Sequence, residues 1–569
     1  MRTKELVRRD GDGHHEPGNV SGVAPGQAIL SARMEGGEGR AKRRPGLARL
    51  RFWLYRQIVA AFVWADFKTQ RVLPLRPPAE GQVEYRPYGE SFPDLPLPGL
   101  YDPQSFPATE QARLRLVAIR VTSAGLRLAR VICPATTPPV PGDIDSLVGA
   151  VYPRLFRLAW PHPPRVPEAL AGGAGGSGAA GAAGADGGAG GARVGVDVIA
   201  ELSVRGPFAS YLRQAASGAY EVDLTWMLQY PAGDGLARPG GRASLETVDG
   251  TLRTVATSGS PAALLAAWNE DLTTFRHNIS VHLAMLTPVA LATTNHLGPS
   301  HPLRRLLQPC FQTVLIGNRE VATLQLSGRR GFSVRIFSHD PEGLVQMSSE
   351  RLGGYDIWDF EPPTHFARRG TLVTPFPYPY RDNVLALWAE TQQYVASYVG
   401  LYYDADSALD ADREVKGWLQ QLDRLVVNGI GLPGDGLTRD WLSRLCATII
   451  HTSTVEHDYL NNVAWNYSTL SWIVPTIVPG SGEPMDQRRA FDLLATIIGT
   501  WKRYNMLLTV EVASLALDEA ARGVMQRWID RLGAVQREMT GVYPDPEWYP
   551  GRAPQPLSYP ANLNPSISN

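Results

Sequence analysis

The sequence predicts a mainly α-helical protein, built as one large helical domain with a few short β-strands. From about residue 261 onward, apolar residues recur at spacings of three and four, which is the period of a helix with one buried face. The 569-residue chain is also 44% hydrophobic, which is enough for a sizeable core. Ser260 followed by Pro261 predicts the start of the first long helix, because Ser caps helices and Pro fits their first turn.

The helical spacing continues in further stretches, with two apolar runs between them. The predicted helical stretches are residues 260–286, 383–403, 412–427 and 488–539. Two short runs, "FQTVLIGN" (311–318) and "GFSVRIF" (331–337), predict strands because they are short and rich in β-branched and aromatic residues.

Two low-complexity segments interrupt this pattern. Residues 1–45 are rich in Gly, Arg and charge without periodicity, and they predict a disordered tail. Residues 171–193 consist almost entirely of Gly and Ala and predict a flexible surface loop. We therefore expect one domain over residues 46–569, with the Gly/Ala run as an insertion.

The composition excludes several classes of protein. With 55 basic and 55 acidic residues the formal net charge is zero, so no nucleic-acid partner is indicated. The cysteines Cys133, Cys310 and Cys446 form no CxxC pair and no even set, which argues against a zinc knuckle or a disulfide framework. No run has the length of a transmembrane helix, and no apolar segment follows the basic N-terminus as in a secretory signal. We expect a cytoplasmic protein.

Six of the eleven histidines fall in two short runs. Both runs lie in apolar helical pattern, and neutral imidazole is the commonest protein ligand for a transition metal. Two such runs predict helices that meet around a buried metal. On spacing alone, ordinary core or surface histidines explain the pattern equally well. The six are His277, His282, His296 and His301 in the first run, and His451 and His457 in the second.

Four segments resemble, in the same order and at similar spacing, motifs of the lipoxygenase family. "HPLRRLLQP" (301–309), followed by "LIGNREVA", is similar to the segment that follows the metal helix of lipoxygenases. Residues 378–418 resemble a stretch with Tyr-Arg-Asp-Asp, Trp, Tyr-Tyr and Asp-x-Glu motifs. "IIHTSTVEHDYLN" (449–461) resembles the helix with the third iron histidine, and "NLNPSISN" (562–569) resembles the family's C-terminus. The chain looks like a compact bacterial-type lipoxygenase without a separate lipid-targeting β-sandwich.

The resemblance implies iron-dependent dioxygenation of polyunsaturated fatty acids. Lipoxygenases use non-haem iron to remove a hydrogen atom from a 1,4-pentadiene, after which O2 adds and a lipid hydroperoxide forms. Such a site must be apolar and dry to protect the radical. We expect fatty acid and O2 as substrates, a monomer, and at most transient contact with a membrane surface. The alternative is a lipoxygenase-fold protein that binds lipid without a competent iron site.

The resemblance also assigns iron ligands. His457 matches the third iron histidine, and Asn461 lies four positions on, on the same face of a helix. The alternative for His457 is a surface histidine beside an acidic neighbour. Asn569 would supply the terminal carboxylate, although the family usually ends in Ile. An ordinary frayed tail is the alternative there.

The first histidine pair departs from the family pattern. His277 and His282 have the His-x4-His spacing of the family, but an ungapped count back from His301 places the ligand positions on residues that are not histidine. Assigning the two ligand positions to His277 and His282 requires fewer residues between this pair and His301 than the family has. A single inserted residue instead makes His277 the second ligand, puts Leu272 at the first and leaves His282 outside the site.

Other residues receive structural or secondary roles. His301 is expected to cap the turn after Gly298-Pro299, and His451 to pack near the site. Arg381 is expected to form a structural pair with Asp382, and the alternative is a role in binding the substrate carboxylate. In lipoxygenases, one position with a small side chain follows the segment that resembles "LIGNREVA". It is Ala in enzymes that form S hydroperoxides and Gly in enzymes that form R hydroperoxides. That position falls on Gly328, which therefore predicts an R product; the alternative is a plain turn glycine in "SGRRG".

Overall fold

A computed structural model gives the structure of most of the helical region. It describes residues 45–69, 75–83, 124–125, 128, 131, 197–326, 331–463, 474–477, 511–543 and 563–566. Residues 1–44, the Gly/Ala run 171–193, the first part (488–510) of the predicted helix 488–539, Gly328 and Asn569 lie outside the described residues. The chain forms two compact units, Met1–Ala48 and Arg49–Asn569, and the following concerns the second. The helix α2 (Pro45–Thr69) spans the boundary between them.

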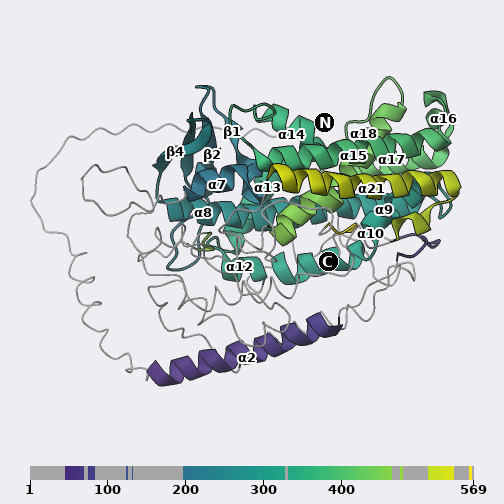
Figure 1. Ribbon diagram of the computed structural model, residues 1–569. Coiled ribbons are helices and arrows are strands. Elements are labelled where there is room, and N and C mark those ends of the chain that lie inside the picture. Colours follow the sequence, from purple (N-terminus) through teal and green to yellow (C-terminus); the bar gives the residue numbers. More distant parts are fainter. Residues whose placement is uncertain are drawn as a thin grey trace, which may run out of the picture. The chain divides into compact units, whose positions relative to one another are not determined.

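A small antiparallel sheet precedes the helices. It has four strands in sequence order, and its last two form a hairpin (Figure 1). Asp249 and Gly250 connect them with φ angles of 51° and 72°. A two-residue turn with both angles positive matches the twist of the flanking strands, and Asp-Gly suits it. The strands are β1 (Arg213–Gln214), β2 (Tyr220–Asp223), β3 (Arg242–Val248) and β4 (Thr251–Ser258).

One continuous helical segment runs through the core. It begins as α8 (Pro261–Glu270), continues as the π-helix η6 (Asp271–Leu286) and ends as α9 (Thr287–His296). The side chain of Ser260 caps it by accepting a hydrogen bond from the backbone N–H of Ala263 at 3.0 Å. The predicted helix start is therefore confirmed.

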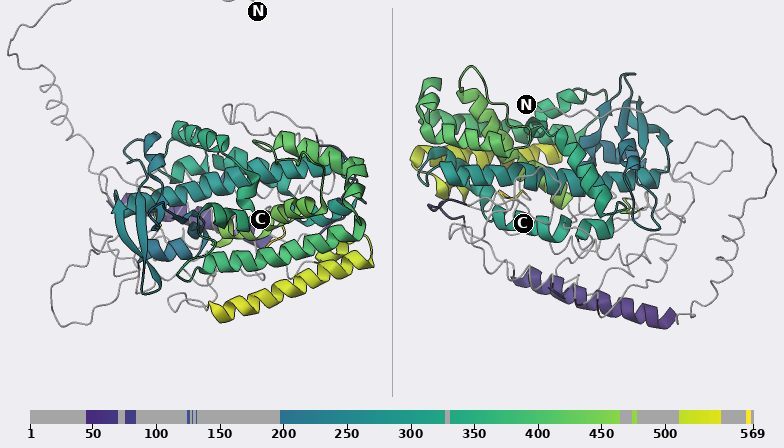
Figure 2. Two further views of the ribbon diagram at one scale, coloured as in Figure 1. Left: turned by 90° about the horizontal axis from the view of Figure 1, so that it is seen from above. Right: turned by 180° about the vertical axis from the view of Figure 1, so that it is seen from behind.

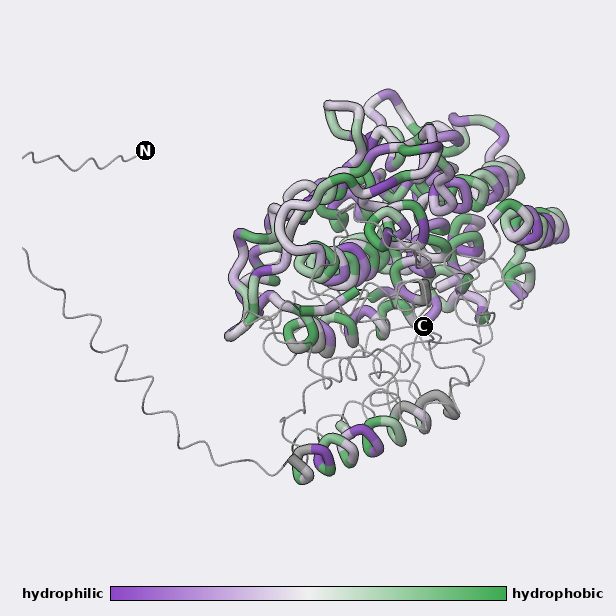
Figure 3. The backbone as a smooth tube through the Cα atoms, turned by 60° about the vertical axis from the view of Figure 1, so that its left-hand side comes forward, coloured by the Kyte–Doolittle hydropathy of each residue, from purple (hydrophilic) through white to green (hydrophobic). Residues whose placement is uncertain are grey.

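Three long helices pack side by side in the same unit. The helix α15 (Pro379–Tyr402) lies against α18 (Arg439–His451) and α21 (Glu519–Val542) (Figures 1 and 2). Tyr394 of α15 stacks on Trp528 of α21 with ring centroids 4.4 Å apart. Hydrophobic and hydrophilic residues alternate within turns of the described helices, as expected where one face is buried (Figure 3).

The remaining described elements are short. They are α7 (Val198–Val204), η4 (Pro207–Tyr211), η5 (Thr225–Gln229), α10 (Pro302–Phe311), α11 (Val314–Glu320), η7 (Val321–Leu326), α12 (Phe332–Ile336), α13 (Pro341–Gly353), η9 (Ile357–Phe360), α14 (Pro362–Arg368), α16 (Asp406–Ala411), α17 (Arg413–Leu425), η10 (Thr452–Glu456), η11 (Tyr459–Val463) and η12 (Val512–Leu515). None of the described helices combines the length and the apolar character needed to cross a membrane.

The fold is mainly helical, as predicted, but the two predicted strands are wrong. The run 311–318 ends α10 and forms most of α11, and the run 331–337 contains α12. Val314 and Ile336 are fully buried there, among helices. A short apolar run cannot be distinguished from a buried helical segment by periodicity, and tertiary packing decided between the two.

Candidate metal centre

Three histidine side chains converge in the core. η6 carries His277 and His282, and His457 lies between η10 and η11. The Nε2 atom of His282 is 3.2 Å from Nε2 of His277 and 3.1 Å from Nε2 of His457. Their exposed fractions are 5%, 4% and 2%, so His457 is not a surface residue. In the described part of the chain, no other three histidine, cysteine or acidic side chains come close enough to hold a metal.

The π-helix explains how two residues five apart share one face. In an α-helix each residue turns about 100°, so positions five apart point about 140° away from each other. The wider turn of a π-helix, with hydrogen bonds between residues five apart, brings those positions back into line. His277 and His282 thus reach the same point, where the ring centroids are 4.8 Å apart. Of the two interpretations of the first run, the structure brings this pair together and includes His282.

Burial keeps all three imidazoles neutral. Desolvation lowers the pKa of His282 to about 4, despite the opposing effect of the hydrogen bond that His282 donates to Asn318. Desolvation also lowers the pKa of His277 and His457 well below its usual range, and the neighbouring imidazoles lower it further. A neutral imidazole keeps a lone pair on one ring nitrogen, which a metal ligand requires.

Asn318, on α11, orients His282. Its amide Nδ2 donates to the backbone oxygen of His282 at 2.6 Å and to Thr287 Oγ1 at 2.8 Å. Its Oδ1 therefore faces His282 Nδ1 at 2.8 Å as an acceptor. The proton of His282 is thus held on Nδ1, and the lone pair of Nε2 points toward the other two histidines. Asn318 stands between the apolar run 314–316 and the charged Arg319–Glu320, so nothing in the sequence marked it for this role.

Two further ligands were predicted, Asn461 and Asn569, and only Asn461 is among the described residues. Asn461 is buried on η11, four residues after His457. Asn569 is outside the described residues, but the nearby chain is held in place. Ser566 Oγ donates to the backbone oxygen of Gln312 at 3.0 Å, and Ser453 Oγ of η10 donates to that of Pro565 at 3.4 Å.

A buried ion pair joins the two helical segments beside the histidines. Arg276 Nη2 and Nε lie 2.5 and 2.8 Å from Glu456 Oε1. Arg276 precedes His277, and Glu456 precedes His457, so the pair connects η6 to η10 next to the cluster. Neither residue was identified from the sequence, because nothing in the spacing shows that positions 180 residues apart meet.

The other histidines lie outside the cluster. His301 caps α10, as predicted: its Nδ1 accepts from the backbone N–H of Leu303 at 3.2 Å. His451 packs edge-on against Trp388 with ring centroids 5.6 Å apart, and burial lowers its pKa to about 3. His296 is partly buried at the end of α9.

The predicted Arg381–Asp382 pair is confirmed. Arg381 Nη2 lies 2.6 Å from Asp382 Oδ1. Arg381 Nη1 also donates to Thr374 Oγ1 at 2.8 Å. The pair therefore ties the start of α15 to the preceding loop, which is a structural role. Gly328 lies outside the described residues, so its predicted role stays a prediction.

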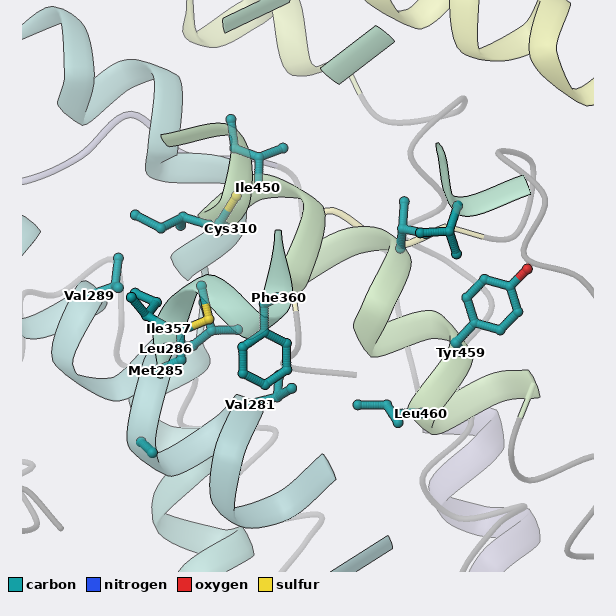
Figure 4. Close-up of a cluster of buried hydrophobic side chains, with 14 of the residues drawn as sticks. Val281, Met285, Leu286, Val289, Cys310, Ile357, Phe360, Ile450, Tyr459 and Leu460 are labelled. Carbon is teal, nitrogen blue, oxygen red and sulfur yellow. The ribbon is translucent and has the colours of Figure 1, made fainter. Parts of the chain in front are cut away.

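Apolar side chains surround the histidine segments. Val281, Met285 and Leu286 of η6 contribute to a buried cluster with Phe360 and Ile450 from other elements (Figure 4). Tyr459 and Leu460, which follow His457 in the chain, are part of the same cluster (Figure 4). Apolar surroundings of this kind disfavour water beside the imidazoles.

Comparison with known proteins agrees with this arrangement. The family model named Lipoxygenase matches residues 271–479, which include all three histidines. Linoleate 9S-lipoxygenase 1 of Hordeum vulgare is 25% identical over 342 residues, covering 50% of this chain and 38% of that protein. Linoleate 9/13-lipoxygenase of Pseudomonas aeruginosa is 30% identical over 192 residues, covering 32% and 27%. The matched stretch thus spans less than two fifths of either relative.

The fold similarity extends further along the chain than the sequence similarity. A calcium-dependent 11R-lipoxygenase superposes with a TM-score of 0.67 at 14% identity, covering 86% of this chain and 78% of that structure. At this identity the likeness concerns the fold. The matched family model and the bacterial and plant relatives assign residues 271–479 to the lipoxygenase family.

Proposed function

We propose that the protein is an iron-dependent dioxygenase that converts polyunsaturated fatty acids to lipid hydroperoxides. His277, His282 and His457 would hold the iron, with the Asn461 amide oxygen and the Asn569 carboxylate as further ligands. The relatives named above support a fatty-acid dioxygenase at the level of the family.

The observation that carries the proposal is the convergence of three buried Nε2 atoms. Two ligand nitrogens about 2.1 Å from a metal and at right angles are about 3.0 Å apart. The separations of 3.2 and 3.1 Å from His282 Nε2 fit this value. Three imidazoles on one side of an ion, completed by oxygen ligands, suit iron and leave room for a further position.

The protein's own residues would bind the substrate in dry surroundings. Bound iron would supply the one-electron oxidation that removes a hydrogen atom from the central carbon of a 1,4-pentadiene. The apolar side chains beside the histidines would receive the diene and exclude water from the carbon radical. Asn318 would keep the Nε2 lone pair of His282 directed inward by holding the Nδ1 proton.

Elemental analysis, together with linoleate oxidation, tests the proposal. We expect about one iron per full-length chain and conjugated dienes from linoleate with matching oxygen uptake. His457→Ala should lose iron and activity together, whereas His296→Gln, outside the cluster, should keep both. Wild-type protein that takes up no added Fe(II) but still binds linoleate would favour the alternative, a lipid-binding protein of the same fold.

A further inference from the structure

Two neighbouring cavities beside η6 share four arginine side chains. The larger has a volume of about 620 Å³ and contacts Phe275, Arg276 and Ser280 of η6. The smaller measures about 210 Å³. Both are lined by the same four guanidinium groups, which places these groups at the junction of the cavities: Arg213, Arg276, Arg351 and Arg369.

The wall of each cavity, taken alone, contains more arginines than acidic residues. Five arginines and three acidic residues line the larger cavity, with Arg368 as the fifth arginine and Glu221, Asp356 and Asp359 as the acids. Four arginines and two acidic residues line the smaller one. Counted once each over both cavities, however, the lining contains five arginines and five acidic residues, so the charge offered to a ligand depends on which arginines are already paired.

Four of the five arginines are already neutralised. Arg213 pairs with Glu221 at 2.8 Å, and Arg276 pairs with Glu456 at 2.5 Å. Arg368 pairs with Asp356 at 2.8 Å. The fourth, Arg351, pairs with Asp271, which lines the smaller cavity. These pairs leave one guanidinium to be accounted for.

Arg369 is the exception. Among the described residues no carboxylate lies within ion-pair distance of its side chain, and its one hydrogen bond runs from Nη1 to the backbone oxygen of Tyr211 at 3.1 Å. Its own backbone oxygen accepts from Gln214 of β1 at 2.8 Å, which holds the residue in place. Burial, and then the charge of Arg276, lower the pKa of Arg369 to about 10. Among the described arginines that line the cavities, Arg369 is therefore the one without an ion pair.

We propose that the junction of these cavities binds the oxyanion of a ligand, a phosphate or a carboxylate group, with Arg369 as its anchor. A guanidinium presents paired N–H donors that match the two oxygens of such a group. Because Arg369 is held by β1 and by Tyr211, little side-chain freedom is lost on binding. The proposal does not depend on iron or on dioxygenation.

Calorimetric titration of the metal-free, full-length protein tests the site. The probes are inorganic phosphate and decanoate, a saturated fatty acid that cannot be oxidised at a 1,4-diene. Arg369→Gln should weaken binding of at least one probe about tenfold, because a charge-assisted hydrogen bond is lost. Arg522→Gln, an exposed arginine on α21, is the matched control and should bind as the wild type does.

The two probes distinguish the source of the oxyanion. Weakened binding of phosphate alone assigns the site to a phosphate group, and weakened binding of decanoate alone assigns it to a carboxylate. Equal weakening of both supports the shared chemistry. Unchanged binding of both, or no binding to the wild type, overturns the proposal. Should Arg369→Gln fail to fold, Arg369→Lys keeps the charge without the paired donors, and wild-type affinity in that variant would overturn it equally.

Discussion

Replacing Arg276 by Met should destabilise the protein strongly, because it leaves a buried carboxylate without its partner. Glu456 is 7% exposed and Arg276 is 14% exposed, and both guanidinium contacts go to Glu456 Oε1. Tyr380 remains as a neighbour, with its hydroxyl 3.4 Å from Oε2, which is too long to compensate a full charge. Breaking a buried pair in this way costs about 3–5 kcal/mol.

A double variant separates the lost pair from the lost packing. Arg276→Met combined with Glu456→Gln removes both charges and keeps the approximate volume of both side chains. Since a neutral replacement of a buried pair is often tolerated, we expect the double variant to be more stable than Arg276→Met alone. Urea unfolding of the metal-free protein at pH 7, followed by circular dichroism, measures the free energies of unfolding of the wild type, of Arg276→Met and of the double variant.

Arg439→Met is the matched control on the surface. Arg439 pairs with Asp406 at 3.2 Å, and the two side chains are 44% and 51% exposed, so water can solvate the remaining carboxylate. We expect a clearly smaller loss than for Arg276→Met. Equal losses for the two variants, or a double variant less stable than Arg276→Met, would refute the reasoning that the buried charge dominates.

Four further predictions concern the site and its surroundings. Between pH 7 and pH 5 the free energy of unfolding of the wild type should fall by about 2 kcal/mol more than that of His451→Phe, as measured by urea unfolding. In that range the folded imidazole stays neutral, with a pKa of about 3, while the unfolded one, near its usual pKa of about 6.5, takes up a proton and stabilises the unfolded state. Asn318→Leu should lower iron affinity about 10- to 100-fold by freeing the His282 proton, measured by competition with a chelator; unchanged affinity would contradict the orienting role. A C-terminal tag should abolish iron binding without unfolding the chain, since it converts the Asn569 carboxylate to an amide, whereas Asn569→Ile should retain it; a fully active tagged protein would exclude this ligand. Gly328→Ala should shift the product from R toward S by closing a pocket for oxygen, and chiral chromatography that shows one unchanged isomer would leave Gly328 as a turn residue only.

The sequence determined much of the helical framework and the ligand types. Ser260-Pro261 set the start of the first long helix because capping depends on local residues alone. The spacing of apolar residues likewise predicted α15 and α17, since each buries one face along its length. The imidazoles of His277, His282 and His457 could be proposed as ligands before any distance was known. Each of these inferences depends only on the types of side chain and on their spacing along a short stretch of the sequence.

Tertiary structure decided the rest. The segments 311–318 and 331–337 became helical because helices surround them, and a short apolar run satisfies either state. Whether His282 joins the cluster depended on the π-helical turn, which the spacing of the residues does not show. The Arg276–Glu456 pair and the contact of Asn318 with His282 join positions 180 and 36 residues apart. Such contacts form only when packing brings distant segments together, because the attraction between two polar groups acts over their distance in space and not along the chain.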